Sequence, residues 1–153
     1  MKTTFVTLAL CFGFGYANAQ HLKEADVPDA VKTAFSQKYP SAKAEWEKEG
    51  ADYEAEFDLG NVESSVVFDA AGTFKELEQE IKTTELPQGV TDYCTKNFAG
   101  YALHEAAKIT DASGKVMFEA EMKKGKEHFD ALFDEKGNFV KKSAPSSKEE
   151  EKD

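Results

Sequence analysis

The chain has 153 residues, of which 29 are acidic and 19 are basic, and its formal net charge at neutral pH is −10. Every basic residue is Lys, so the planar guanidinium fork that suits phosphate and carboxylate recognition is missing throughout. This acidic, arginine-free composition argues against nucleic acid or an anionic membrane surface as the partner.

The first nineteen residues have the pattern of a signal peptide. Lys2 gives a positive start, 5–16 form an apolar run too short to span a bilayer, and 17–19 (Ala-Asn-Ala) supply the small residues needed for cleavage. We therefore predict a signal peptide over 1–19, a mature chain that begins at Gln20, and a periplasmic or secreted location.

The two cysteines fall on either side of the predicted cleavage point. A lipoprotein signal with Cys11 as the acylated residue is less favoured, because Leu10 stands where a small residue is expected. After cleavage the chain keeps only Cys94 and cannot form an internal disulfide. No later segment is apolar enough to cross a membrane, so we expect no membrane insertion of the mature chain.

An internal repeat organises the mature chain. The segment 27–31 (VPDAV) returns as 86–90 (LPQGV), and 68–74 (FDAAGTF) returns as 133–139 (FDEKGNF). The two copies are farther apart at the second motif, which places extra residues of the second copy in a hairpin near 111–114. Duplication of this kind predicts two small units in tandem, each of which would be marginal alone.

Each copy is expected to begin with a helix. In the first copy, apolar residues recur at helical spacing from Val27 to Tyr39, and Pro40 ends the helix. In the second copy a helix is predicted over about 87–98, with Gly100 placed to end it.

After each helix, apolar and charged residues alternate, as in 52–59 (DYEAEFDL). This alternation is typical of strands with one face on a core and the other toward water. The predicted strands of the two copies are 42–49, 52–59, 62–69 and 73–82, then 101–110, 115–124, 127–134 and 138–142.

The predicted fold class is therefore α+β, with two tandem repeats, each a helix packed on an antiparallel meander sheet of about four strands. We expect the two sheets to lie side by side around a shared or adjoining core. Large apolar residues disappear after the last strand, which is typical of a disordered tail. The predicted division is 1–19 signal peptide, 20–84 first repeat, 85–142 second repeat and 143–153 charged tail.

Three Asp-x-x-Gly segments begin at Asp69, Asp111 and Asp134. They are superficially similar to calcium-binding loops, but each lacks the oxygen ligands at alternating positions that such a loop supplies. Tight turns between strands are the preferred interpretation.

The exported context, the duplication and the two motifs, [VL]-P-x-x-V at 27–31 and 86–90 and F-D-x-x-G-x-F at 68–74 and 133–139, resemble the PepSY-like family of β-lactamase-inhibitor-like proteins. The resemblance covers about 26–142. It implies a helix over one face of an antiparallel sheet, twice over, in small exported proteins typical of Bacteroidetes. It also implies protein binding through the open sheet face, and it brings no catalytic motif.

Strand parity places one unusual set of residues on the face opposite the helices. If Phe68 points to the core, Val67 points outward, and its counterpart Leu132 does the same. Apolar residues on a solvent face do not stabilise a monomer, although scattered surface aliphatics are ordinary. We predict that a partner binds to a surface formed by Glu54, Glu56, Val67, Glu119, Glu121, His128, Asp130 and Leu132.

The residues that could support catalysis or metal binding are few. Cys94 occupies the helix position that Phe35 fills in the first copy, which favours a buried core thiol over a reactive one. His21, His104 and His128 do not have the spacing of a metal site, so we expect surface histidines, with His21 in a disordered terminus.

Two pairs of glutamates, Glu54 with Glu56 and Glu119 with Glu121, recur at matching positions. A glycosidase-like role is disfavoured, because carboxylates two apart on an exposed strand lack the apolar pocket that would raise one pKa. Trp46 could anchor a partner, but its parity favours packing beneath the helix.

These features predict an exported, non-catalytic protein-binding or inhibitor-like module whose partner is an extracytoplasmic protein or peptide. The alternative is a periplasmic protein that binds a small ligand or cation. We predict no catalytic, cofactor or metal site.

Overall fold

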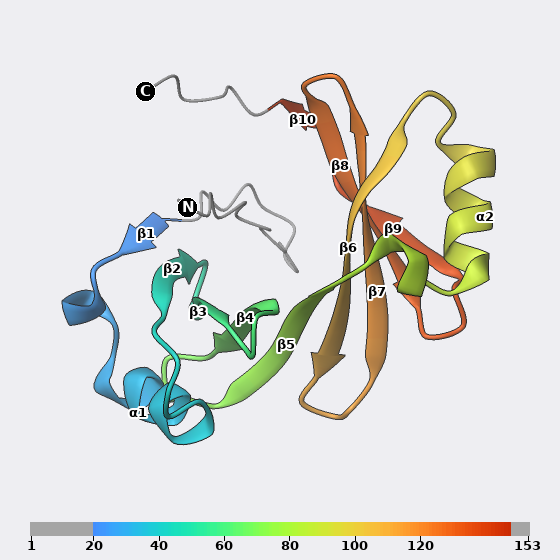
Figure 1. The fold of residues 1–153 in the computed structure, drawn as a ribbon. Helices are drawn as coiled ribbons and strands as arrows, with labels where there is room; N and C mark the ends of the chain where they lie inside the picture. Colours follow the sequence, from blue (N-terminus) through green and yellow to red (C-terminus); the bar gives the residue numbers. More distant parts are fainter. Residues whose placement is uncertain (1–19, 148–153) are drawn as a thin grey trace.

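The computed structural model describes residues 20–147. The predicted signal peptide, with Cys11, and residues 148–153 lie outside the described residues. A strand and a 3-10 turn precede α1 and its four strands; a second 3-10 turn then precedes α2 and the remaining strands (Figure 1). The helical elements are η1 (Glu24–Asp26), α1 (Asp29–Lys38), η2 (Thr83–Glu85) and α2 (Gln88–Asn97). The strands are β1 (Gln20–Leu22), β2 (Glu45–Glu49), β3 (Asp52–Asp58), β4 (Glu63–Phe68), β5 (Phe74–Ile81), β6 (Ala102–Asp111), β7 (Val116–Lys124), β8 (Glu127–Asp134), β9 (Phe139–Lys142) and β10 (Ser146–Ser147).

The two α-helices form as the repeated motif predicts. Each begins directly after a proline, Pro28 or Pro87. Proline has no backbone N–H, so at the start of a helix it leaves no hydrogen-bond donor unsatisfied. Each then buries two residues four positions apart, which lie on one helical face: Val31 with Phe35 in α1, and the corresponding pair in α2. The predicted helices and the eight predicted strands are confirmed, with shifts of a few residues at their ends.

All the strands belong to one antiparallel sheet. Its order is β1-β2-β3-β4-β5-β6-β7-β8-β10, with β9 also paired to β8. The link between the two halves is the pairing of β5 with β6, which runs from Glu76↔Asp111 to Ile81↔Ala106. The α+β class and the antiparallel meanders are confirmed. The two meanders are joined edge to edge into one sheet, because β6 pairs along β5 (Figure 1).

The sheet carries two apolar cores rather than a shared one. The first core packs α1 on β2–β4 around Phe35, Phe57 and Phe68, and the second packs α2 on β6–β8 around Met122 and Phe133. Of the two expected arrangements, a shared or an adjoining core, the structure does not have the shared one. Each helix packs mainly on the strands of its own half, and Ile81 of β5 adds to the second core.

Strand β5 shows that both helices cover the same face of the sheet. Leu77 packs against the first core and Ile81 against the second. These residues are four apart on one strand, so their side chains point to one face. The opposite face has no helix against it among the described residues, and it carries Glu76, Glu78 and Glu80 from β5.

The chain ends differ from prediction in the part that the structure describes. His21, which was expected in a disordered terminus, lies in β1 opposite Glu47 of β2. Residues Ser146 and Ser147, which were expected in a disordered tail, form β10 against β8. The prediction is wrong at both places, because backbone pairing to an available strand edge orders segments whose side chains offer little apolar surface.

A glycine in the first Asp-x-x-Gly turn allows the β4–β5 connection to approach α1 closely. Gly72 has φ +80°, and a β-carbon there would stand 2.6 Å from the carbonyl oxygen of Ala30. Gly60, in the β3–β4 turn, has φ +65° but no atom within 4 Å of the corresponding position.

We expect Gly72→Ala to destabilise the chain by about 1–3 kcal/mol, through both the left-handed backbone and the contact with α1. Gly60→Ala is the matched control, because it introduces the same strain without the contact and should cost less. Urea unfolding of both variants measures the difference, and equal losses would contradict a close packing of this turn on α1.

Candidate functional site

The sheet face opposite the helices brings the predicted partner-binding residues together. The register pairs Glu54 with Val67, Glu119 with Leu132 and Glu121 with Asp130 across neighbouring strands. Glu78 of β5 lies on the same face, opposite Ser65 of β4. We call this surface the acidic face and define it by Glu54, Glu56, Val67, Glu76, Glu78, Glu119, Glu121, His128, Asp130 and Leu132.

The expected exposure of Val67 and Leu132 is wrong. Both lie on the acidic face, but their exposed fractions are only 7% and 5%. Leu132 packs with Ile109 and Met117 in a small apolar cluster on this face, separate from the two helix-covered cores. Strand parity predicted correctly which face Val67 and Leu132 lie on, but not that they are buried there. Neighbouring side chains of the continuous sheet cover both residues.

Four glutamates of the acidic face are also buried. The exposed fractions of Glu54 and Glu119 are 1% each, that of Glu78 is 5% and that of Glu121 is 7%. One oxygen of Glu54, one of Glu78 and both of Glu119 have no hydrogen-bond partner among the described residues. Burying a carboxylate without a partner is strongly unfavourable, so these side chains are neutral in this state or require a cation.

Burial changes the acidity of these groups. It raises the pKa of Glu54 to about 8, a change opposed by a hydrogen bond with Ser65 and increased by neighbouring glutamates. Burial also raises the pKa of Glu78 and Glu119 well above the ordinary range. The argument that the Glu54 pair lacks an environment able to raise one pKa is therefore wrong.

The charges that act on these groups come from both halves of the chain. The repulsion felt by Glu78 of β5 comes from Glu54 of β3 and Asp130 of β8, among others. Glu119 of β7 feels Glu78 and Asp130 most strongly. Carboxylates from both halves of the chain therefore converge over the centre of the sheet.

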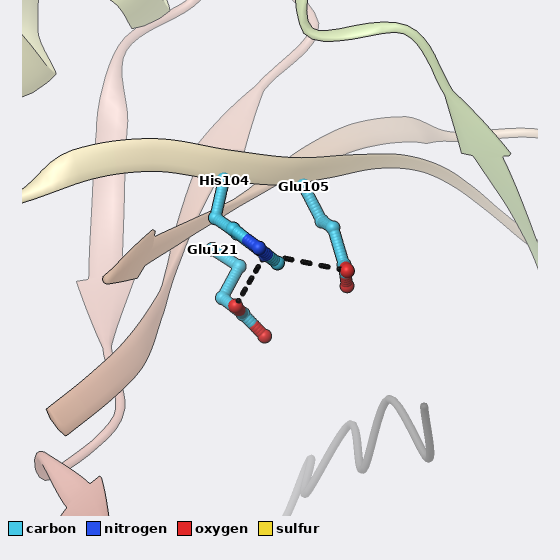
Figure 2. A group of neighbouring side chains, drawn as sticks. All are labelled: His104, Glu105 and Glu121. Carbon is cyan, nitrogen blue, oxygen red and sulfur yellow. Dashed lines mark ion pairs between the residues drawn. The ribbon is translucent and has the colours of Figure 1, made fainter. Parts of the chain in front are cut away.

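A second group of polar side chains lies beside this centre. The Nδ1 atom of His104 is 3.3 Å from Oε1 of Glu105 and 3.1 Å from Oε1 of Glu121 (Figure 2). One potential ligand atom from each of the three residues lies within 4.8 Å of the others. We call these residues the His104 cluster.

A β-bulge creates the His104 cluster. Leu103 pairs with Met122 and Glu105 pairs with Glu121, so His104 is an extra residue opposite a single step of β7. On a regular strand His104 and Glu105 would point to opposite faces. The bulge instead directs both toward Glu121, which is why sequence spacing gave no sign of this cluster.

Most other candidate residues have structural roles. Cys94 is buried in the second core, as predicted, and burial raises the pKa of its thiol to about 11. Trp46 lies in the first core with its ring centroid 5.4 Å from that of Phe35, which confirms the core interpretation. His128 is half-buried, and its Nε2 lies 2.9 Å from Oγ of Ser146.

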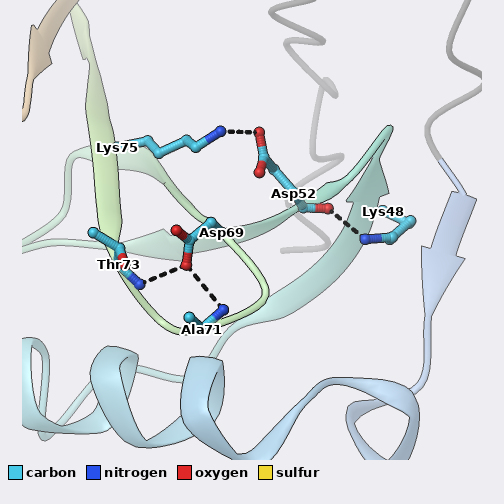
Figure 3. A network of polar contacts seen from close by, with 6 residues as sticks. All are labelled: Lys48, Asp52, Asp69, Ala71, Thr73 and Lys75. Carbon is cyan, nitrogen blue, oxygen red and sulfur yellow. Dashed lines mark hydrogen bonds and ion pairs between the residues drawn. The ribbon is translucent and has the colours of Figure 1, made fainter.

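The Asp-x-x-Gly segments are tight turns, as predicted. In the first, Oδ1 of Asp69 accepts hydrogen bonds of 2.9 Å from the backbone N–H groups of Ala71 and Thr73 (Figure 3). Asp111 and Asp134 accept equivalent bonds from their own turns. The pKa of all three aspartates is lowered, mainly by the side chain of Ser113 for Asp111, the side chain of Asn138 for Asp134 and the backbone N–H of Thr73 for Asp69. One carboxylate oxygen of each is thus committed to its own turn.

The fold is that of an α+β protein with two helices on one face of a continuous antiparallel sheet, and family models identify it further. The chain belongs to the family described as "Putative beta-lactamase-inhibitor-like, PepSY-like", whose model matches residues 16–75 and 51–141. A search of curated proteins gives no significant match. Within the described residues, no helix is long and apolar enough to span a membrane.

Three solved structures from Bacteroides have a similar fold. A "putative periplasmic" protein from Bacteroides eggerthii is 19% identical, with a TM-score of 0.67 over 76% of this chain and 88% of its own. A DUF2874 family protein from Bacteroides uniformis is 17% identical, with a TM-score of 0.66 over the same shares. A BLIP-like protein from Bacteroides fragilis is 21% identical, with a TM-score of 0.60 over 82% of this chain and 92% of its own.

We expect Glu54→Gln to stabilise the chain at pH 8 but hardly at pH 5. The folded state retains a proton on Glu54 up to about pH 8, whereas the unfolded chain releases it near the ordinary glutamate pKa of 4.5. Stability contributed by that proton is complete below about pH 4.5 and is lost as the pH rises through 8. Since one pKa unit corresponds to about 1.4 kcal/mol, a gain of at least about 1 kcal/mol at pH 8 is expected.

Urea unfolding at the two pH values measures this effect. Glu45→Gln is the matched control, because Glu45 lies on the same face, opposite Glu56, but is exposed. Equal behaviour of the two variants at pH 8 would show that Glu54 is solvated in solution.

Proposed function

We propose that this chain is an exported, non-catalytic binding module that holds a cationic segment of another extracytoplasmic protein on the acidic face. The observation that carries the proposal is the burial of Glu54, Glu78 and Glu119 with carboxylate oxygens that have no hydrogen-bond partner among the described residues. Lysine or arginine side chains of a partner would supply the missing donors through charge-assisted hydrogen bonds.

The arrangement of the acidic face suits a protein partner better than a free ion. The apolar cluster of Ile109, Met117 and Leu132 lies among the carboxylates. These apolar residues are buried in the isolated chain, so the carboxylates around them would make the contacts with a partner. Charged groups at an interface set specificity and association rate, which suits a partner segment that carries several basic residues.

The comparisons support the same class of function. The description of the family includes resemblance to β-lactamase inhibitors, and the similar protein from Bacteroides eggerthii is described as periplasmic. Cys94, the one cysteine of the described residues, is packed in a core and has a raised pKa, so it is unsuited to act as a nucleophile. These points favour an inhibitor-like or tethering role over catalysis.

Replacing Glu54, Glu78 and Glu119 together with Gln should abolish partner capture while leaving the fold intact, because an amide keeps the side-chain volume but cannot ionise when a cationic group arrives. The matched control replaces Glu24 with Gln, and Asp26 and Asp29 with Asn. These three residues are exposed beside α1, away from the acidic face. Both variants replace three carboxyl groups with amides, so a general effect of losing carboxyl groups would appear in both.

The measurement is affinity capture by the tagged mature chain, residues 20–153, from envelope and culture fractions of its own organism, followed by lysine-directed cross-linking and mass spectrometry. We expect a protein recovered by the native chain and the control but reduced at least tenfold with the acidic-face variant, and cross-linked through a basic segment. Equal recovery by both variants, equal loss in both, or no enriched protein would overturn the proposal.

A further inference from the structure

We propose that His104, Glu105 and Glu121 form a binding site for a divalent transition metal ion of the zinc class. This inference goes beyond the binding of a protein partner and does not depend on it, since the His104 cluster lies at the bulge of β6 beside the carboxylates proposed to hold the partner.

The geometry of the cluster fits a tetrahedral ion. Zinc takes nitrogen and carboxylate ligands at about 2.0–2.2 Å, so neighbouring ligand atoms of a tetrahedral site are about 3.3 Å apart. The separations from Nδ1 of His104 to the two carboxylates, 3.3 and 3.1 Å, are already close to this value (Figure 2). Three protein ligands would leave one coordination position for water or for a donor atom of another molecule.

The strand pairing gives an independent reason for a cation at this place. Glu105 and Glu121 are directly opposite each other on β6 and β7, an arrangement in which like charges destabilise a sheet. Glu121 is well buried, with 8% of its side chain exposed, and its described ion-pair partner is His104. Glu119, two residues away on the same face, is fully buried and has both oxygens without a partner among the described residues.

The chemistry of the ligands selects the class of metal. Calcium and magnesium prefer a shell made of oxygen atoms, which an imidazole nitrogen does not provide. Imidazole with carboxylates suits zinc, nickel, cobalt and copper. The side chain of His104 is 43% exposed, so an ion can reach the site from solvent, while the buried carboxylate of Glu121 fixes the other side.

Calorimetric titration of the mature chain, residues 20–153, with zinc chloride tests the site. This form contains every residue of the described elements. We expect one ion per chain, with affinity reduced at least tenfold by His104→Ala and by Glu121→Gln. Glu121→Gln keeps the shape of the buried side chain, and His104 is partly exposed, so both variants should fold; circular dichroism checks this.

Two other histidines provide matched controls. His128→Ala removes a half-buried histidine from β8, and His21→Ala removes the one beside the mature N-terminus, which could chelate an ion with the terminal amine. Both should leave the affinity unchanged. Cobalt substitution should give the intense visible absorption of tetrahedral cobalt in the native chain and not in His104→Ala.

Three results would overturn the proposal. They are no zinc binding to the native chain at millimolar concentration, unchanged binding in His104→Ala and Glu121→Gln, or loss of binding with His21→Ala alone. Since partner capture is measured separately and its variants leave the His104 cluster intact, failure of one proposal is distinguishable from failure of the other.

Discussion

The pairing of β5 with β6 is the interaction on which the rest of the structure depends. Without it, each half would be a helix on a small five-stranded sheet with exposed edge strands, and each core would be small for its chain length. With it, Ile81 of the first half packs into the second core, and Glu78 comes opposite Ile109 of the second half. The same backbone hydrogen bonds that remove the two sheet edges also bring carboxylates of both halves onto one continuous face.

Much of the fold was predictable because it depends on local patterns. The proline-started helices, the period-two strands and the Asp-x-x-Gly turns each follow from short segments such as 27–31 and 68–74, and the structure places them as expected. Parity also predicted that Val67, Leu132 and the paired glutamates share a face. The union of the two sheets was not predictable in this way, since it depends on which strand edges meet, and alternation within a strand carries no information about its neighbour.

The parts of the candidate site that sequence reasoning missed have two distinct physical causes. The burial of Glu54 and Glu119 depends on side chains from other strands of the assembled sheet. The alternation of apolar and polar residues along one strand predicts only that the polar ones face away from the core. The His104 cluster depends on one extra residue in β6, which reverses the parity between Leu103 and Ala106: both pack toward the second core although they are three apart. A change in the apolar parity within one strand, from Leu103 to Ala106, was the signal that could have revealed the bulge.

Some charges on and beside the acidic face have partners, and others do not. Lys75 Nζ lies 2.6 Å from Oδ2 of Asp52, and Nδ1 of His104 lies near carboxylates of Glu105 and Glu121. Glu78 and Glu119 are buried, and they have oxygens without a hydrogen-bond partner in the part of the chain that the structure describes. A face built only for stability would place apolar residues or a lysine there, since an unpaired buried carboxylate lowers stability whether it is ionised or protonated. Under the proposed function, the residues that weaken the isolated chain would strengthen its complex with a cationic partner, because ligand binding to the folded state adds to its stability.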